Sequence, residues 1–226
     1  MAGTKRQKLC ERILPTYTKG EEIFNMVTHI AGGAFGVVYL VLCVIMAAIH
    51  HNPMGVVASA IYGASVIILF TMSSVYHGVR PSTAKKVLQV IDHCTIYLMI
   101  AGTYTPIALC GVRGQNEALG WVLFGIIWGV TALAATFTAI DLNKYKTFSM
   151  LCYLGMGWCV VGFWKPTYAA IGAGGAAFLI AGGILYTLGA ILYGMGKKKK
   201  FIHSVFHIFV DLASVCHFFC ILLYVL

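Results

Sequence analysis

Charged side chains are scarce in this sequence. Asp, Glu, Lys and Arg make up only 10% of its 226 residues, and Asp and Glu together number seven. A soluble domain carries about 25% charged residues, whereas 60% of the residues here are hydrophobic and the mean hydropathy is +0.86. These proportions exclude a water-soluble globular domain and indicate a protein that crosses a membrane several times.

Closely spaced cysteines are also lacking. The eight cysteines are scattered, without a CxxC pair, and most lie in apolar stretches where a free cysteine behaves as a small hydrophobic residue. This excludes a disulfide framework and a thiolate zinc site. The net charge of +9 does not indicate a nucleic-acid partner, because no basic patch alternates with exposed aromatic residues. We expect the basic loops to contact membrane lipids instead.

Long apolar runs fill most of the chain. A helix needs roughly 20 apolar residues to cross about 30 Å of hydrocarbon, and uninterrupted runs of this length satisfy their backbone as helices. We predict an all-α membrane protein with a cytoplasmic segment, 1–24, and a single seven-helix domain, 25–226. The predicted spans are 25–49, 54–77, 87–111, 118–140, 147–164, 168–194 and 202–226.

Lys and Arg alternate between the ends of these spans. Fourteen of the sixteen lie in the N-terminal segment and in the second, fourth and sixth loops, and the other loops hold only Arg113 and Lys165. Basic loops stay on the cytoplasmic side. We therefore expect a cytoplasmic N-terminus, an external C-terminus and a location in the plasma membrane.

Ionisable residues inside spans are costly, and those present are functional candidates. His77 ends the second predicted span, Asp92 lies near the start of the third, and the seventh begins with His203 and His207. The predicted topology brings all four to the inner leaflet. His203 and His207 are four residues apart and share a helix face, and Ser73 lies one turn from His77. Three histidines with an open water position are typical of catalytic zinc, and Asp92 would hold or deprotonate that water.

Three motifs combine these residues with a further set in the first predicted helix. They are E-x2-N-x3-H (Glu22, Asn25, His29), S-x3-H followed by an aspartate (Ser73, His77, Asp92), and H-x3-H (His203, His207). In this combination the chain resembles the progestin and adipoQ receptor family, in its hemolysin III branch, within the CREST superfamily of membrane hydrolases. The resemblance implies that the three histidines bind Zn2+, that the aspartate and serine serve the zinc-bound water, and that a lipid amide is hydrolysed as in ceramidases.

Three functions remain open from the sequence. The first is a zinc-dependent hydrolase acting on a lipid amide or ester; the second is a non-enzymatic membrane sensor or receptor in which zinc holds helices together. The third is a pore-forming cytolytic protein, after the name of the hemolysin III branch, whose bacterial members are linked to membrane homeostasis. The sequence identifies no protein partner.

Several polar residues have two possible roles. Glu22, Asn25 and His29 share one helix face and either cap the first helix or close the cytoplasmic mouth of the site. Asp211 either orients His207 or is a buried hydrogen bonder. His93 and His217 are expected to join neighbouring helices rather than bind the ion.

Overall fold

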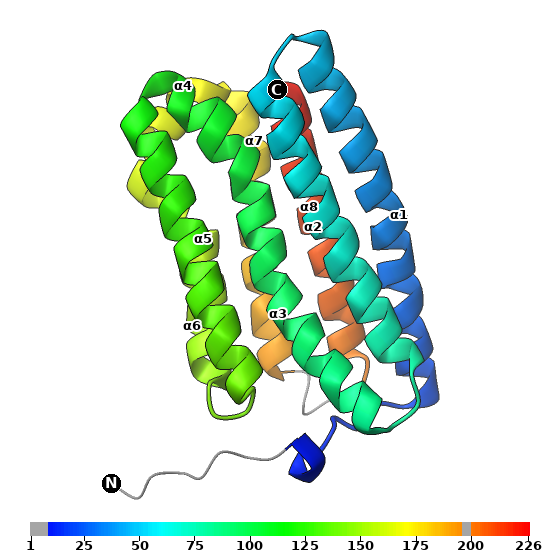
Figure 1. Ribbon diagram of the computed structural model, residues 1–226. Helices are drawn as coiled ribbons and strands as arrows, with labels where there is room; N and C mark the ends of the chain where they lie inside the picture. Colours follow the sequence, from blue (N-terminus) through cyan, green and yellow to red (C-terminus); the bar gives the residue numbers. More distant parts are fainter. Residues whose placement is uncertain (1–8, 196–199) are drawn as a thin grey trace, which may run out of the picture.

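The computed structural model describes residues 9–195 and 200–226, and over this part of the chain it contains helices and no strand. Six helical segments there are long and apolar enough to cross a membrane, which confirms an all-α membrane fold. Figure 1 shows them arranged as a bundle. They are α1 (Lys19–Ile49), α2 (Pro53–Gly78), Thr83–Gln115, α5 (Glu117–Ile140), Lys146–Met195 and α8 (Ile202–Tyr224).

Capping residues between the apolar runs fix where helices begin. Thr18 caps α1 in a capping box with Glu21, in which each side chain bonds the backbone of the other residue. Asn52 caps α2 by accepting a hydrogen bond from a backbone N–H of the first turn. Such caps satisfy N–H groups that have no partner within the helix. Because of this capping box, α1 begins at Lys19 rather than at residue 25, where the predicted span begins.

The segment Thr83–Gln115 changes its helical form after Pro106. Proline has no N–H, and its ring crowds the preceding turn, so an α-helix is commonly interrupted near it. The segment consists of α3 (Thr83–Pro106), a π-helical stretch η2 (Ile107–Val112) and the short helix α4 (Arg113–Gln115). It therefore extends beyond both ends of the predicted span 87–111.

The segment Lys146–Met195 is 50 residues long and has three parts. The first has only 12 residues. The predicted span 147–164 therefore corresponds to this helix together with the 3-10 helix that follows it. The parts are α6 (Lys146–Gly157), the 3-10 helix η3 (Cys159–Phe163) and α7 (Trp164–Met195).

This segment folds back on itself. The indole of Trp158, at the end of α6, donates a hydrogen bond of 3.0 Å to the hydroxyl of Thr187 in α7. Within α7 the backbone is kinked at Gly172, where φ is 61°, a conformation that glycine adopts without steric cost. Two antiparallel arms result, and the boundary between them at Gly172 lies inside the predicted span 168–194 rather than between residues 164 and 168.

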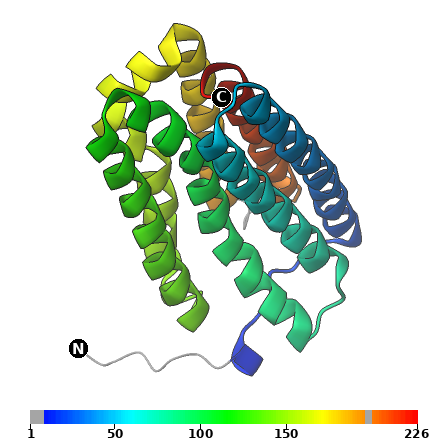
Figure 2. The same ribbon diagram turned by 45° about the horizontal axis from the view of Figure 1, so that its top comes forward.

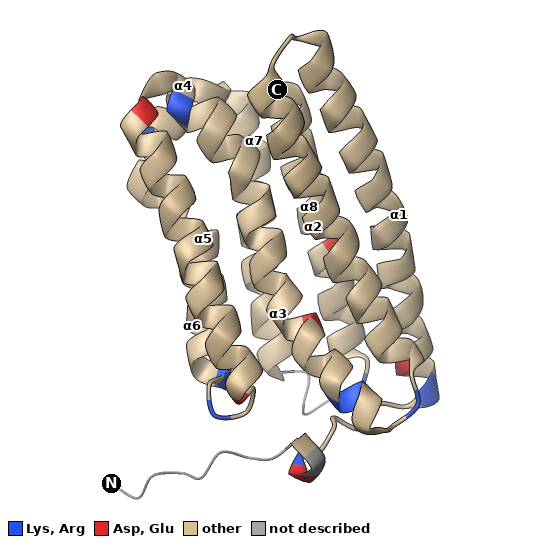
Figure 3. Cartoon of the chain, viewed as in Figure 1, with Lys and Arg blue, Asp and Glu red and all other residues tan. Residues whose placement is uncertain are grey.

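Helices from both ends of the chain share one side of the bundle. α1 contacts α2 and α8, α2 contacts α3, and α7 contacts α8, an arrangement that can be followed in Figures 1 and 2. Lys and Arg gather at the end where α1 and α3 begin, and few lie at the other end (Figure 3). The end of α2 and the starts of α3 and α8 meet at this basic end.

Candidate metal centre

Three histidines meet at the basic end of the bundle. His77 lies in the last turn of α2, and His203 and His207 lie in the first two turns of α8. One ring nitrogen of each lies within 4.8 Å of those of the other two, and the three residues are at most 9% exposed. The predicted proximity of these three residues is confirmed, and the cluster is suited to hold a metal ion.

The ring nitrogens fit a tetrahedral ion. Nε2 of His203 and Nε2 of His207 lie 3.2 Å apart, and two ligands at 2.0–2.1 Å from a tetrahedral zinc ion are separated by about 3.3 Å. Nε2 of His77 is buried without a hydrogen-bond partner among the described residues, an arrangement that is rare unless an ion or water satisfies the atom. Imidazole ligands suit zinc, copper, iron and nickel. The residues present therefore fit a metal ion with three protein ligands and an open position.

The third ligand is held by an acidic residue of α1. Oε2 of Glu22 lies 2.6 Å from Nδ1 of His77, and Oε1 of Glu22 accepts a 2.7 Å hydrogen bond from Nζ of Lys85. An ionised carboxylate only accepts hydrogen bonds, so Nδ1 carries the proton and Nε2 is left to bind an ion. Carboxylates orient metal-binding histidines in this way in many proteins.

The other two residues of the first motif also reach the cluster. The amide of Asn25 lies 3.5 Å from Nδ1 of His77. The ring of His29 stacks on that of His207 with 3.7 Å between centroids. The N-cap is filled by Thr18 rather than by these residues. The structure thus favours a role for Glu22, Asn25 and His29 at the site over a role as helix caps.

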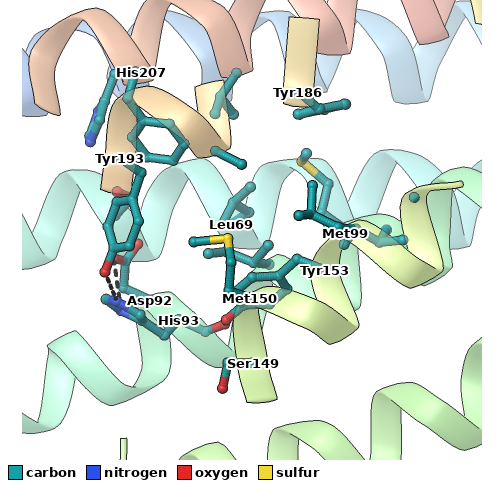
Figure 4. Close-up of a pocket in the computed structure, with 18 of the residues that line it drawn as sticks. Leu69, Asp92, His93, Met99, Ser149, Met150, Tyr153, Tyr186, Tyr193 and His207 are labelled. Carbon is teal, nitrogen blue, oxygen red and sulfur yellow. Dashed lines mark hydrogen bonds and ion pairs between the residues drawn. The ribbon is translucent and has the colours of Figure 1, made fainter. Parts of the chain in front are cut away.

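Asp92 lies beside the histidines. Its Oδ2 lies 3.7 Å from Nδ1 of His93, and Asp92 and Ser73 line the same cavity. Nε2 of His93 lies 3.1 Å from the hydroxyl of Tyr193 in α7. In Figure 4, Tyr193 lies between His207 and the pair formed by Asp92 and His93. The structure therefore brings Ser73 and Asp92 together, and His93 joins two helices as expected.

A cavity of about 1000 Å³ extends from these residues into the bundle. Ser73, Asp92 and His207 line one end, and its walls further along are largely apolar, including Met99 and Leu69 (Figure 4). Ligand cavities typically measure about 300–1,000 Å³ and combine apolar walls with a few polar groups. This cavity has room for an amphiphile whose polar group lies beside the histidines.

An N-terminal strap, residues 12–18, lies across the basic end of the cavity, and residues 13–18 line it. The ring of Tyr17 stacks on that of His203 with 4.9 Å between centroids. Arg12 anchors the strap by donating a 2.9 Å hydrogen bond to Oε1 of Gln89 in α3. Burial raises the pKa of the Tyr17 phenol, so this group stays protonated at neutral pH.

Two polar residues of α8 lie outside the cluster. None of the hydrogen bonds of the described residues joins the carboxyl group of Asp211 to His207, and Oδ1 of Asp211 is buried without a partner. Asp211 therefore does not orient His207 through a hydrogen bond. Nε2 of His217 lies 3.2 Å from the carbonyl oxygen of Leu179 in α7, which is the expected contact between helices.

Sequence reasoning missed Lys85 and Tyr17. The stretch between the second and third predicted spans includes Lys85, but the structure places this residue in the first turn of α3, where it is only 3% exposed and is hydrogen-bonded to Glu22. A signal was present, since Lys85, Gln89 and Asp92 are spaced four and three apart and thus share one face of α3. No sequence signal marks Tyr17, because its contact with His203 depends only on the path of the strap.

Comparisons with known proteins agree with these features. A family model described as "Haemolysin-III related" matches residues 17–218. The chain is 38% identical to "Hemolysin-3" of Bacillus cereus over 206 residues, 91% of this chain and 92% of that protein. It is 36% identical to "Hemolysin-3 homolog" of Bacillus subtilis (strain 168) over 208 residues, 92% of this chain and 96% of the relative.

A more distant similarity extends to animals. The chain is 28% identical to "Monocyte to macrophage differentiation factor" of Homo sapiens over 172 residues, 71% of this chain and 67% of that protein. The bacterial relatives cover most of the sequence, and the residues matched by the family model include all three motifs. The chain therefore belongs to the haemolysin-III-related family of integral membrane proteins.

Proposed function

We propose that this protein is a zinc-dependent hydrolase that cleaves a lipid amide or ester in the plasma membrane and thereby contributes to membrane homeostasis. The observation that carries the proposal is the convergence of three histidine nitrogens beside Asp92 at the polar end of a large, mostly apolar cavity. Zinc bound there would supply Lewis-acid chemistry, polarising a carbonyl group and making water a nucleophile near neutral pH.

The chain's own residues would move the protons. Asp92 accepts a proton from the attacking water and returns it to the amine or alcohol that leaves. Ser73, which lines the cavity with Asp92, would orient the carboxyl group or the attacking water through its hydroxyl. Glu22 holds the ring of His77 through Nδ1. These roles use every residue of the S-x3-H and aspartate motif.

A lipid would reach the cavity sideways from the bilayer. Exposed residues that line the cavity include three large apolar ones between α6 and α7: Trp158 and Val161, at the turn after α6, and Ile180 in α7. Their exposed fractions are 36%, 61% and 38%. A gap between these residues would admit an acyl chain directly from the membrane, which supports a lipid rather than a water-soluble substrate.

The topology that accompanies this function has seven crossings. The fold-back of Lys146–Met195 makes two crossings of one 50-residue segment, and an odd number of crossings leaves the chain ends on opposite sides. The basic end of the bundle (Figure 3) would face the cytoplasm, since Lys and Arg are retained there. The metal centre then lies at the depth of the inner leaflet.

Metal content and hydrolysis, measured on the same detergent-purified samples, test the proposal. We expect about one zinc per wild-type chain by elemental analysis, and loss of zinc and of lipid amide or ester hydrolysis in His77→Ala, His203→Ala and His207→Ala. The matched control is His51→Asn, which removes an exposed histidine outside the cluster. Asparagine is chosen because it adopts the positive φ of 52° at this position more readily than most residues. A folded wild-type protein that binds no zinc would refute the proposed hydrolase function.

A sensor or receptor with structural zinc is the second candidate. It is favoured by one observation: the three ligands bridge α2 and α8, which belong to opposite ends of the chain, so an ion between them would hold the bundle together. A structural ion contributes folding free energy. Metal removal that lowers the melting temperature strongly, in a protein that hydrolyses none of the lipids tested, would support this candidate instead.

A further inference from the structure

Lys85 is a buried cation that the proposed hydrolysis does not use. It is 3% exposed, and its Nζ lies 2.7 Å from Oε1 of Glu22, 2.9 Å from the carbonyl oxygen of Val79 and 3.4 Å from that of His77. Nζ also lies 5.1 Å from the ring centroid of Tyr76. Burying an ammonium group is costly unless its charge is paired and its N–H groups are satisfied. The pairing with Glu22 meets this requirement.

Glu22 uses its two oxygens for two different partners. Oε1 accepts from Lys85, and Oε2 accepts from Nδ1 of His77 at 2.6 Å. The Glu22 side chain is 21% exposed, so without a cationic partner the carboxylate has a path toward water. Lys85 removes this alternative by fixing Oε1 inside the bundle.

We propose that Lys85 is a positioning residue of the metal centre, acting through Glu22 to hold His77 with its proton on Nδ1 and with Nε2 facing His203 and His207. The inference rests on the proposed metal centre for its functional meaning. It deepens that proposal by extending the group that orients one ligand to α1 and α3, two helices that supply none of the three ligand histidines.

A purely structural role predicts a different outcome. Lys85 also bonds the carbonyl oxygens of His77 and Val79, which lie at the C-terminal end of α2, where a cation stabilises the helix. If this were its only role, its removal would lower thermal stability and leave the tautomer of His77 unchanged. The two roles are therefore separated by an observation made on the His77 ring itself.

The first experiment measures that tautomer in the metal-free wild type. Nitrogen-15 NMR of histidine-labelled protein, assigned with His77→Ala, distinguishes a proton on Nδ1 from one on Nε2. We expect His77 to be protonated on Nδ1 in wild type and in Lys86→Met, a control that removes a cation one position away. In Lys85→Met we expect a mixture of tautomers. An Nε2-protonated His77 in wild type overturns the inference, whether or not the protein binds metal.

The second experiment measures zinc affinity by competition with a chelator. We expect Lys85→Met to bind zinc roughly 10- to 100-fold more weakly than wild type, as for other residues that orient a metal ligand, and Lys85→Arg to recover most of the loss. Because Lys85 acts through Glu22, adding Lys85→Met to Glu22→Ala should cause no further loss. Wild-type affinity in Lys85→Met, or additive losses in the double variant, would contradict the inference.

These outcomes separate the inference from the proposed function. A wild type that binds no zinc but holds His77 protonated on Nδ1 refutes the hydrolase and leaves the positioning of His77 by Lys85 standing. A wild type that binds zinc, together with a Lys85→Met variant that binds zinc equally well, refutes the positioning role of Lys85 and leaves the metal centre standing. If Lys85→Met does not fold, the tautomer of wild-type His77 and the zinc affinities of Lys85→Arg and Glu22→Ala decide the question.

Discussion

Histidines in this bundle differ in chemistry because their neighbours differ. His77 has its Nδ1 occupied by Glu22 and its Nε2 free, whereas His93 has both nitrogens near partners, the carbonyl oxygen of Gln89 and the hydroxyl of Tyr193. Only a ring with an unoccupied nitrogen aimed at the cluster can bind an ion. The sequence predicted from depth and spacing that these three histidines meet, but the occupied Nδ1 and the free Nε2 of His77 are properties of the folded protein.

At the scale of single residues, Asp92→Asn should abolish most of the proposed hydrolysis. The amide matches the carboxylate in size but cannot accept a proton, and general-base catalysis contributes about 10²- to 10⁴-fold. Zinc content should remain at the wild-type level, because Asp92 is not one of the three clustered nitrogen donors. The rate is measured on lipid amides and esters in mixed micelles, with zinc quantified in the same sample. Hydrolysis at the wild-type rate would exclude Asp92 as the base.

At the scale of elements, Gly32 is a point where α1 closely approaches both α2 and α8. A Cβ at Gly32 would lie 2.7 Å from Oδ1 of Asp211 and 2.7 Å from the ring of Phe70, whereas a Cβ at Gly33 would meet only Phe70, at 3.8 Å. Gly32→Ala should therefore destabilise the protein by about 1–3 kcal/mol through overpacking. Gly33→Ala should be neutral or slightly stabilising because alanine favours the helix.

Thermal unfolding in detergent, followed by circular dichroism, compares these two adjacent variants with wild type. The pair is closely matched, since both replace a glycine by alanine in the same turn of α1. A melting temperature for Gly32→Ala equal to that of Gly33→Ala would mean that α1 does not approach α8 and α2 as closely as described.

The N-terminal strap should control access to the metal centre. Tyr17 covers His203 with its ring, so Tyr17→Ala should speed the removal of bound zinc by a chelator several-fold, while Tyr17→Phe, which keeps the stacked ring, should not. Ile13→Ala is the control within the same strap, because Ile13 is 88% exposed and the stacking on His203 is made by Tyr17. The rate of zinc loss is followed with a chromophoric chelator. Equal rates in Tyr17→Ala and wild type would show that the strap does not limit access.

For the whole molecule, seven crossings require the two sides of the bundle to face different compartments. Alkaline phosphatase fused after Leu226 should be active in a bacterial host, and the same reporter fused in the loop at Asn143, on the basic side, should be inactive. Green fluorescent protein fused at these positions should give the opposite pattern. A fluorescent fusion after Leu226 would place both ends of the chain on one side and contradict an odd number of crossings.

Local properties of the sequence determined the class of fold and the depth of the site. Apolar composition over about 20 residues sets a membrane helix, and a spacing of four sets which side chains share a face; neither requires knowledge of the other helices. The helical segments follow from the first rule, and the approach of His77 to His203 and His207 follows from the spacing together with the topology that the basic loops predict. The start of α1 was predicted too late because the capping box of Thr18 and Glu21 extends the helix through polar residues.

Only the tertiary structure decided which groups act on one another across the bundle. Glu22 and Lys85 are 63 positions apart in the chain, and Tyr17 meets His203 from the opposite end of the sequence. Such contacts depend on the rotation and separation of packed helices and on the course of the strap, which composition and periodicity do not encode. The three clustered histidines could therefore be found from the sequence, whereas the pairing of Lys85 with Glu22, the strap over His203 and the cavity beside the cluster arise from how the helices pack.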